Sequence, residues 1–438
     1  MDKIKLENAG DKVSKTFCIL PWIHQHTWPN GDVFPCCVSK SSMPLGNMKE
    51  KPLEEIWNSD ESKELRRQLL NGEEPEACTR CFMHEKIGTM PFRVSSNNNW
   101  KHRIDRAVET TDLDGYSHEF RLNYWDFRFS NVCNLKCRMC GPELSSSWYQ
   151  DQIEMFGQAT TPRALIHVND VSVKDVNYYV DKFIDQVEEV YFAGGEPLMM
   201  DEHYRILEKL LEVGNTNCRI RYNTNFMRLK FKKWDVVPMW RQFNDINKYN
   251  LRVVASLDAM GEVIEYIRTG TIWNVVDKNI ERVLGEGIDI RTSSTIGLMN
   301  VYNIPEFIDK MLSYGVPYHH LELNNVLTFP DYYHMNILPD QIKQQIETKL
   351  FNHADKIYDT VSKEAGEYFK GCYYVFKKYL YSEPERDINH ILKDFKSLTL
   401  KKDKHRKTNF GETFPHMKDW FESLDTWEEG DRDKQHML

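Results

Sequence analysis

The sequence lacks the features that would place it in or across a membrane. No apolar run approaches the roughly 20 residues that a helix needs to span a bilayer. The N-terminal segment MDKIKLENAGDK has no apolar core of the kind found in secretory signal peptides. We therefore expect a cytoplasmic protein that does not act in a membrane.

The sequence also lacks an excess of basic residues. Its formal net charge is −9 at pH 7, with 57 lysines and arginines against 66 aspartates and glutamates. Proteins that bind nucleic acid need clustered positive charge to neutralise phosphates. The one basic stretch, KKDKHRK at 401–407, is flanked by acidic residues and is typical of a solvated surface. We therefore expect no nucleic acid among the partners.

Cysteine, in contrast, is plentiful, with ten residues. In a reducing compartment, clustered cysteines more often bind metal or serve catalysis than form disulfides. Cys133, Cys137 and Cys140 follow one another as C-x3-C-x2-C in CNLKCRMC. Three thiolates from one loop can each bind one iron of a 4Fe–4S cluster, which leaves the fourth iron without a protein ligand. An open metal position is typical of a site that binds a further ligand.

The chain divides into four segments of different character along its 438 residues. Residues 1–95 hold five cysteines and are predicted to form a small module, with a hairpin around PNGD and a helix in PLEEIWNSDESKELRRQLL. Residues 96–120 are polar and are predicted to be a linker. Residues 121–330 alternate short strands with amphipathic helices, and residues 331–438 are predicted to form a mostly helical extension.

The alternation in residues 121–330 predicts an α/β fold with a parallel sheet and helices outside it. Six strands can be counted, fewer than the eight of a complete barrel, so we expect an open or partial barrel. In such folds the functional groups gather at the C-terminal edge of the sheet. The candidates that directly follow predicted strands are Cys133, Glu196, Asn225 and Ser256.

Taken in order, the motifs resemble those of the radical SAM superfamily. The cysteine motif follows the first predicted strand of the sheet, and YFAGGEP at 191–197 follows the second. NTN at 223–225, ASLDA at 255–259 and YIRTG at 266–270 resemble the family's third-strand, fourth-strand and arginine elements. Agreement in order and context is far more specific than any single motif. The resemblance implies a partial (β/α)6 barrel over residues 121–330.

The resemblance also implies cofactors and an activity. The three cysteines would hold a 4Fe–4S cluster, and S-adenosylmethionine (SAM) would fill the open iron through its amino and carboxylate groups. Reductive cleavage of SAM would give a 5′-deoxyadenosyl radical that abstracts hydrogen from a substrate. The GGEP turn would meet the SAM amino group, because glycine allows a close approach of backbone to ligand. Its residues are Gly194, Gly195, Glu196 and Pro197.

Further SAM contacts follow from the same resemblance. Ser256 and Asp258 would contact the ribose or the methionyl group, and Asn225 belongs to the polar third-strand motif. Arg268 would pair with the SAM carboxylate, because its planar fork suits two oxygens. Met139 stands where the family often has an aromatic residue that touches adenine, and a thioether can still pack on a purine face.

Four cysteines of the N-terminal module form a second candidate metal site. By spacing alone, four thiolates in two pairs suit a structural zinc ion as well as a 4Fe–4S cluster. Cys36 and Cys37 compete for one of the positions, and the G-x4-C spacing from Gly31 favours Cys36. The expected ligands are Cys18, Cys36, Cys78 and Cys81.

This module resembles the twitch domain, the shortened relative of the SPASM domain. The G-x4-C spacing and GNMKEKPLEEIWNS at 46–59 carry the resemblance. It implies a second, auxiliary 4Fe–4S cluster closed by four protein ligands. In familiar members the domain follows the barrel, whereas here it precedes it.

Three functions remain open at this stage. Relatives with twitch or SPASM domains act on ribosomal peptides, on proteins or on small molecules. We favour hydrogen abstraction from a peptide or protein residue, with a small-molecule dehydrogenase or rearranging enzyme as the alternative. A non-catalytic iron–sulfur or zinc scaffold is the third, and the intact GGEP and Arg268 elements speak against it. An enzyme of this class would need an electron donor such as flavodoxin or ferredoxin.

Overall fold

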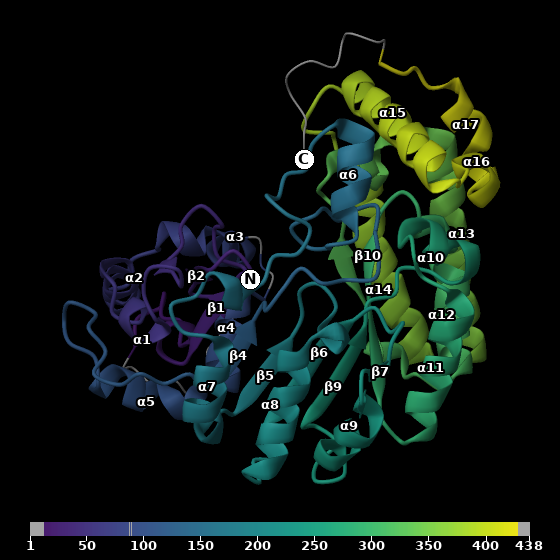
Figure 1. The fold of residues 1–438 in the computed structure, drawn as a ribbon. Helices are drawn as coiled ribbons and strands as arrows, with labels where there is room; N and C mark the ends of the chain where they lie inside the picture. The colour runs from purple at the N-terminus through teal and green to yellow at the C-terminus, as the bar shows by residue number, and fades with distance from the viewer. Residues whose placement is uncertain (1–12, 87, 89, 428–438) are drawn as a thin grey trace. The chain divides into compact units, whose positions relative to one another are not determined.

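The computed structural model describes residues 13–86, 88 and 90–427, and they form two compact units. Unit 1 contains the described residues up to Asn131, together with Leu165–Arg221 and Gln242–Leu251. Unit 2 contains Val132–Ala164, Tyr222–Arg241 and the described residues from Arg252 onward. The ribbon of each unit is drawn in Figure 1.

Unit 1 begins with the hairpin that the sequence predicts. Strands β1 (His24–Thr27) and β2 (Asp32–Phe34) pair in antiparallel fashion, and β3 (Gly46–Asn47) extends them. Helices follow as α1 (Leu53–Ile56), α2 (Asp60–Leu70) and α3 (Thr79–Lys86). The predicted helix is therefore present, although it is divided into α1 and α2.

About half of the polar segment that the sequence predicts as a linker is helical. Helices α4 (Phe92–Asn99) and α5 (Lys101–Glu109) occupy it and its N-terminal border. Trp100, Ile104 and Ala107 are buried, so one side of α5 packs into unit 1. The exact domain boundaries stay predictions.

The first strand of the cysteine-rich module joins the sheet of the barrel. Strand β1 runs parallel to β4 (Tyr124–Phe127), which in turn runs parallel to β5 (Glu189–Phe192). Helices α7 (Val176–Phe183) and α8 (Asp201–Glu212) pack on one face of these strands. The rings of Phe127 and Tyr179 lie 6.4 Å apart, and those of Phe192 and His203 lie 4.7 Å apart.

Unit 2 contains parallel strands. Strand β10 (Ile290–Ile296) runs parallel to β9 (Leu251–Ala255) on one side and to β11 (Leu321–Val326) on the other. The helices between these strands are α10 (Gly261–Ile267), α11 (Trp273–Gly285) and α12 (Ile304–Ser313). Strand β6 (Arg219–Thr224) has residues in both units. All six strands predicted for residues 121–330 are therefore present.

The C-terminal extension is helical, as the sequence predicts. Its longer helices are α13 (Asp340–Thr360), α14 (Lys363–Leu380) and α15 (Ile388–Arg406), followed by α16 (Phe410–Thr413) and α17 (Lys418–Ser423). Helix α15 lies beside α6 (Trp148–Phe156), which follows the cysteine loop (Figure 1).

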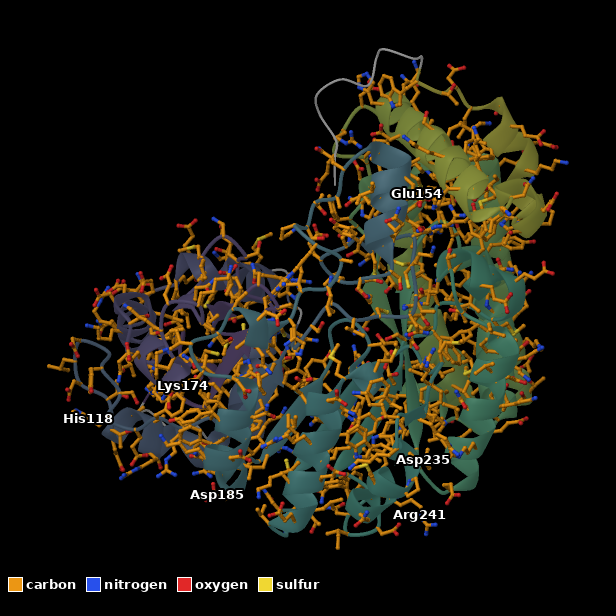
Figure 2. The ribbon with its side chains drawn as sticks, viewed as in Figure 1. His118, Glu154, Lys174, Asp185, Asp235 and Arg241 are labelled. Atoms are coloured by element: carbon orange, nitrogen blue, oxygen red, sulfur yellow. The ribbon has the colours of Figure 1, made fainter. Side chains whose placement is uncertain are left out.

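Two further short elements complete unit 2. A small hairpin pairs β7 (Lys230–Phe231) with β8 (Trp234–Asp235), and it leads into α9 (Val236–Asn244). Glu154 on α6 and Arg241 on α9 lie at opposite ends of unit 2 (Figure 2). None of the helices in the described part of the chain combines the length and the apolar character needed to cross a bilayer.

Candidate active site

The cysteine loop that follows β4 is fixed by the segment that ends α10. Lys136 N donates to Thr269 O at 2.7 Å, and Arg138 N donates to Ile267 O at 2.8 Å. Gly270 has a φ of +102°, and a Cβ there would lie 3.0 Å from Asn134 O. This close approach of two backbones explains the glycine of YIRTG and places Arg268 beside the cysteines.

Two cysteines of this loop, Cys137 and Cys140, are hydrogen-bonded to one another. A hydrogen bond from Cys140 lowers the pKa of the Cys137 thiol to about 7, and the Arg268 guanidinium acts in the same direction. The same hydrogen bond and burial raise the pKa of Cys140. Leu135 N lies 3.5 Å from Cys133 Sγ. Because the thiolate is the form that binds metal, Cys137 is prepared for that role.

Arg268 is held by Asp258, the aspartate of ASLDA. Its Nε lies 2.6 Å from Asp258 Oδ2, and its Nη2 lies 3.0 Å from Oδ1. Thr295 N donates to the same Oδ1 at 2.8 Å, and Asp258 is fully buried. Arg268 Nη1 lies 4.0 Å from Cys137 Sγ. The structure thus brings three sequence-predicted residues together and shows Asp258 in contact with protein groups.

The polar residues at the ends of β6 and β9 lie in the same unit. Asn225 Nδ2 donates to Asn134 Oδ1 at 2.9 Å and lies 4.0 Å from Cys133 Sγ. Ser256 N donates to Thr224 O at 2.8 Å. Asn225 therefore contacts the cysteine loop directly, while Ser256 continues the backbone pairing between the two strand ends.

A small cavity lies beside Met139, and its other walls were not anticipated from the sequence. Asn300 Nδ2 donates to Asp258 O at 2.8 Å, and Asn300 Oδ1 accepts from Gly297 N at 2.8 Å. Gly297 ends the strand segment DIRTSSTIG, and Asn300 follows it closely in the sequence. Functional residues of such folds lie at strand ends, so both positions could have been identified as candidates. Tyr333 had no such signal. The cavity is lined by Arg138, Met139, Ile267, Thr295, Gly297, Met299, Asn300, Leu327 and Tyr333.

The GGEP turn belongs to unit 1 and follows β5 directly. Gly194 and Gly195 have φ values of +82° and +53°, which a residue with a side chain rarely adopts. Glu196 is buried and its Oε1 accepts from Leu198 N at 3.2 Å, while Pro197 opens a short 3-10 turn. The backbone conformation therefore favours glycine at both positions, and at Gly194 a Cβ would also lie only 2.8 Å from Arg128 Cδ.

The four cysteines expected to hold the auxiliary cluster interact with one another. Cys18 interacts electrostatically with Cys78 and Cys81, and Cys36 interacts with Cys18 and Cys78. Burial is the main cause that raises the pKa of each thiol, to about 12 for Cys78. Four largely buried sulfurs suit a metal centre, because bound metal replaces the thiol protons.

Cys37 has different neighbours from Cys36. Burial raises the pKa of its thiol to about 12, and its further interactions include Asp126 and Arg128. The cysteines of the chain are all free thiols, so neither of the two is used in a disulfide.

Family models match both cysteine regions. A model described as the radical SAM superfamily matches residues 127–313. A model of the SPASM domain, described as an iron–sulfur cluster-binding domain, matches residues 18–82. No curated protein matches the chain.

Solved structures give weaker likenesses. The structure of anSMEcpe with bound AdoMet is 14% identical with a TM-score of 0.33, over 54% of this chain and 59% of that one. The structure of Streptococcus suis SuiB bound to precursor peptide SuiA is 14% identical with a TM-score of 0.32, over 59% and 54%. The chain thus spans less than two thirds of the length of these proteins, and the likeness carries no conclusion about what it binds.

Proposed function

Because the chain belongs to the radical SAM superfamily and carries a SPASM iron–sulfur domain, it is a radical SAM enzyme, and we propose that it modifies a residue of a peptide or protein. When bound, the cluster and SAM supply a 5′-deoxyadenosyl radical that abstracts hydrogen from the substrate. The protein's own side chains hold the cluster, orient SAM and exclude water.

In this proposal Cys133, Cys137 and Cys140 bind the SAM cluster. The observation that carries it is the approach of Arg268 Nη1 to Cys137 Sγ at 4.0 Å, across 131 residues of sequence. A guanidinium at that distance favours the thiolate that iron requires. The loop also keeps all three thiols on one short segment, which is what wrapping a single cluster demands.

The residues assigned to SAM lie in both units, and each is assigned from the motif to which it belongs. The Asp258 carboxylate accepts hydrogen bonds from Nε and Nη2 of Arg268, so we assign Nη1 to the SAM carboxylate. The turn of Gly194, Gly195, Glu196 and Pro197 offers backbone groups to the SAM amino group. Met139, which lines the small cavity together with Tyr333, is assigned to the face of adenine. Asn225 and Ser256 are assigned to polar contacts with SAM.

The auxiliary cluster is assigned to Cys18, Cys36, Cys78 and Cys81. The interactions of Cys36 with Cys18 and Cys78 support Cys36 as the ligand. Cys37 is then a spare thiol. Cysteines without disulfides and two iron–sulfur clusters also suit a reducing cytoplasm, where a flavodoxin or ferredoxin would supply the electron.

The peptide or protein substrate is supported by the resemblance of the N-terminal module to twitch and SPASM domains. A small metabolite is the competing substrate class. Peptide and metabolite substrates can be distinguished by following deuterium, because hydrogen abstraction transfers it from a labelled substrate into 5′-deoxyadenosine.

The test is anaerobic. Reconstituted protein is assayed for iron and sulfide, then supplied with dithionite, SAM and either a deuterated peptide pool or a deuterated metabolite pool. We expect about eight irons per chain for two 4Fe–4S clusters, and label transfer from the peptide pool. A Cys133/Cys137/Cys140→Ala variant should cleave no SAM. Label from metabolites alone would refute the peptide assignment, and about four irons with one zinc would refute the auxiliary cluster.

A further inference from the structure

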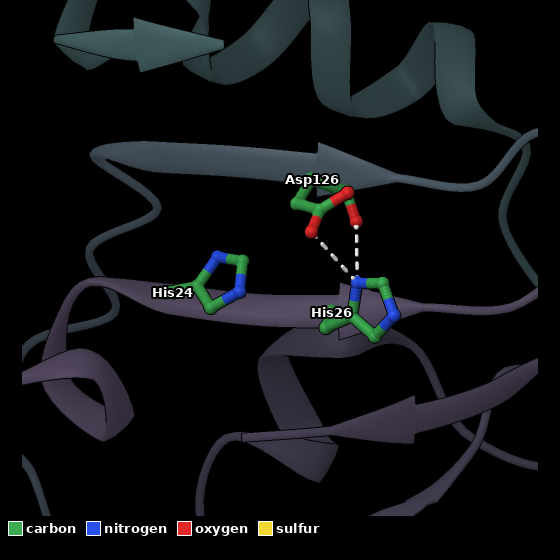
Figure 3. Close-up of side chains that lie close together, drawn as sticks. All are labelled: His24, His26 and Asp126. Atoms are coloured by element: carbon green, nitrogen blue, oxygen red, sulfur yellow. Dashed lines mark hydrogen bonds and ion pairs between the residues drawn. The ribbon is translucent and has the colours of Figure 1, made fainter. Parts of the chain in front are cut away.

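A histidine of the cysteine-rich module faces an aspartate of the barrel strand. Strands β1 and β4 pair in register, with His24 opposite Tyr124 and His26 opposite Asp126. The Nδ1 atom of His26 lies 3.0 Å from Asp126 Oδ2 (Figure 3). Asp126 is fully buried and His26 is 3% exposed, so water does not compete for this contact.

Asp126 joins His26 to Arg128. Arg128 Nε lies 2.9 Å from Asp126 Oδ1, and Nη2 lies 3.2 Å from Oδ2. Burial alone would raise the pKa of the Asp126 carboxyl, but Arg128 and His26 hold it well below its usual range. The carboxylate is therefore ionised and fixes the guanidinium plane from one side.

Arg128 in turn lies against the GGEP turn. Its guanidinium stacks on the Tyr191 ring at 5.0 Å from the centroid. A Cβ on Gly194 would lie 2.8 Å from Arg128 Cδ, 3.4 Å from its Cβ and 3.5 Å from its Cγ. The aliphatic part of the Arg128 side chain thus fills the space beside Gly194 and packs against the turn.

A metal site is the alternative reading of this region, because His24, His26 and Asp126 offer ligand atoms within 4.8 Å of one another. Two contacts speak against that. Arg128 already neutralises Asp126, so a divalent cation would add buried positive charge without a counter-charge. His24 Nδ1 is also engaged with Tyr124 O at 3.0 Å, and its ring stacks on Tyr124.

We propose that His26 and Asp126 are positioning residues for SAM, which act by holding Arg128 beneath the Gly194–Pro197 turn. The inference rests on the proposed function, because it takes that turn to bind the SAM amino group. It makes a histidine of the N-terminal module part of the support for the SAM site. The module and the sheet are then one functional piece, and the module does more than hold an auxiliary cluster.

The test compares two histidines of the same strand. His26→Leu removes the hydrogen bond to Asp126, and His26→Asn keeps an N–H at the δ position. His24→Leu is the matched control, because both histidines are buried and bond to the backbone carbonyl opposite them, whereas His26 also contacts the Asp126 carboxylate. Binding of radiolabelled SAM is measured on anaerobically reconstituted protein whose iron content and thermal unfolding are checked first.

We expect His26→Leu to weaken SAM binding about tenfold, which corresponds to the loss of one charge-assisted hydrogen bond. Asp126→Asn should do the same, while His26→Asn and His24→Leu should stay near the wild type. If His26→Leu and His24→Leu lost SAM affinity equally, the effect would come from strand packing and the inference would be overturned. So would unchanged affinity in His26→Leu.

Two further outcomes are distinguishable. A wild type that carries its clusters but binds no SAM refutes the proposed function itself. One Co²⁺ bound per chain with a nitrogen and oxygen ligand spectrum, abolished by His24→Leu and by His26→Leu, would overturn the hydrogen-bond chain in favour of a metal site.

Discussion

The Asp258 carboxylate forms a two-point ion pair with the Arg268 guanidinium. Nε and Nη2 lie 2.6 Å and 3.0 Å from the two carboxylate oxygens, and Thr295 N holds one of those oxygens at 2.8 Å. A two-point pair fixes the plane as well as the position of the charge. The remaining nitrogen faces Cys137 Sγ at 4.0 Å. Arg268 is thus fixed in orientation next to the cysteine motif before any ligand arrives.

Arg268→Lys should therefore weaken SAM binding by about tenfold or more, because an ammonium cannot reproduce the two-point contact. Iron content should not change, since the cysteines remain. Equilibrium SAM binding and an iron assay on the same sample measure both quantities. Arg252→Lys, which alters a half-exposed pair with Glu322, is the control. Wild-type affinity in Arg268→Lys would remove this residue from the proposed SAM site.

Arg138 predicts an effect on stability. It stands between two residues of the cysteine motif and pairs with Asp403 on α15, while its guanidinium lies 3.6 Å from the centre of the Tyr266 ring. Asp403 also accepts from Tyr266 Oη at 2.9 Å, Thr408 Oγ1 at 2.8 Å and Phe410 N at 2.7 Å. The helical extension is therefore bound to the cysteine loop through one buried carboxylate.

Asp403→Ala leaves the buried Arg138 charge without its partner, so it should lower the unfolding free energy by about 3–5 kcal/mol. Anaerobic denaturant unfolding measures the change, and Asp419→Ala on the exposed side of α17 should change it by less than about 0.5 kcal/mol. Similar unfolding of both variants would mean that the Arg138–Asp403 pair does not stabilise the loop.

The candidate site residues could be proposed from the sequence because they lie in local motifs. The strand, cysteine, GGEP and arginine elements recur in a fixed order, and each one depends on neighbours a few residues away. All six strands and the helical C-terminal extension follow from periodicity in the same way. Helix α5 was missed although Trp100, Ile104 and Ala107 have helical spacing, since its polar residues outnumber them.

Other features have no local signature. Strand β1 pairs with β4 across 100 residues, and parallel pairing requires no turn that a sequence pattern could reveal. Arg138 meets Asp403 across 265 residues, and single charged residues are ordinarily assigned to the surface. Asp126 and Arg128 lie in the strand before the cysteine motif, and nothing in the local sequence indicates that they pair with each other beside His26.

His203 predicts a dependence of stability on pH. It is fully buried between the Phe192 and Tyr204 rings, and burial lowers its pKa to about 3. In the unfolded chain the ring gains a proton as pH falls below about 6.5. The folded state binds fewer protons in that window, so stability should fall by up to about 1.4 kcal/mol per pH unit from this residue.

His203→Gln should therefore lose less stability than the wild type between pH 6.5 and pH 5. The measured quantity is the fall in thermal unfolding midpoint across that interval. His102→Gln, at an exposed histidine paired with Glu188, should keep a decrease close to that of the wild type. An equally steep fall in His203→Gln would show that other groups cause the acid sensitivity.

Single cysteine variants separate the two proposed clusters. Cys133→Ala removes a ligand from the first loop and should cost about four of about eight irons, because a 4Fe–4S cluster is lost as a unit. Cys18→Ala should cost the other four and leave SAM binding in place. Cys218, buried at the start of β6 and assigned to neither site, is the control, and Cys218→Ala should keep all the iron.

The same assay decides between Cys36 and Cys37. Cys36→Ala should lower iron as Cys18→Ala does, since Cys36 interacts with Cys18 and Cys78. Cys37→Ala should not, because its thiol has Asp126 and Arg128 among its neighbours. The reverse result would move the ligand position by one residue. It would also bring the auxiliary cluster next to Asp126, and the support of the GGEP turn would then depend on whether that cluster is present.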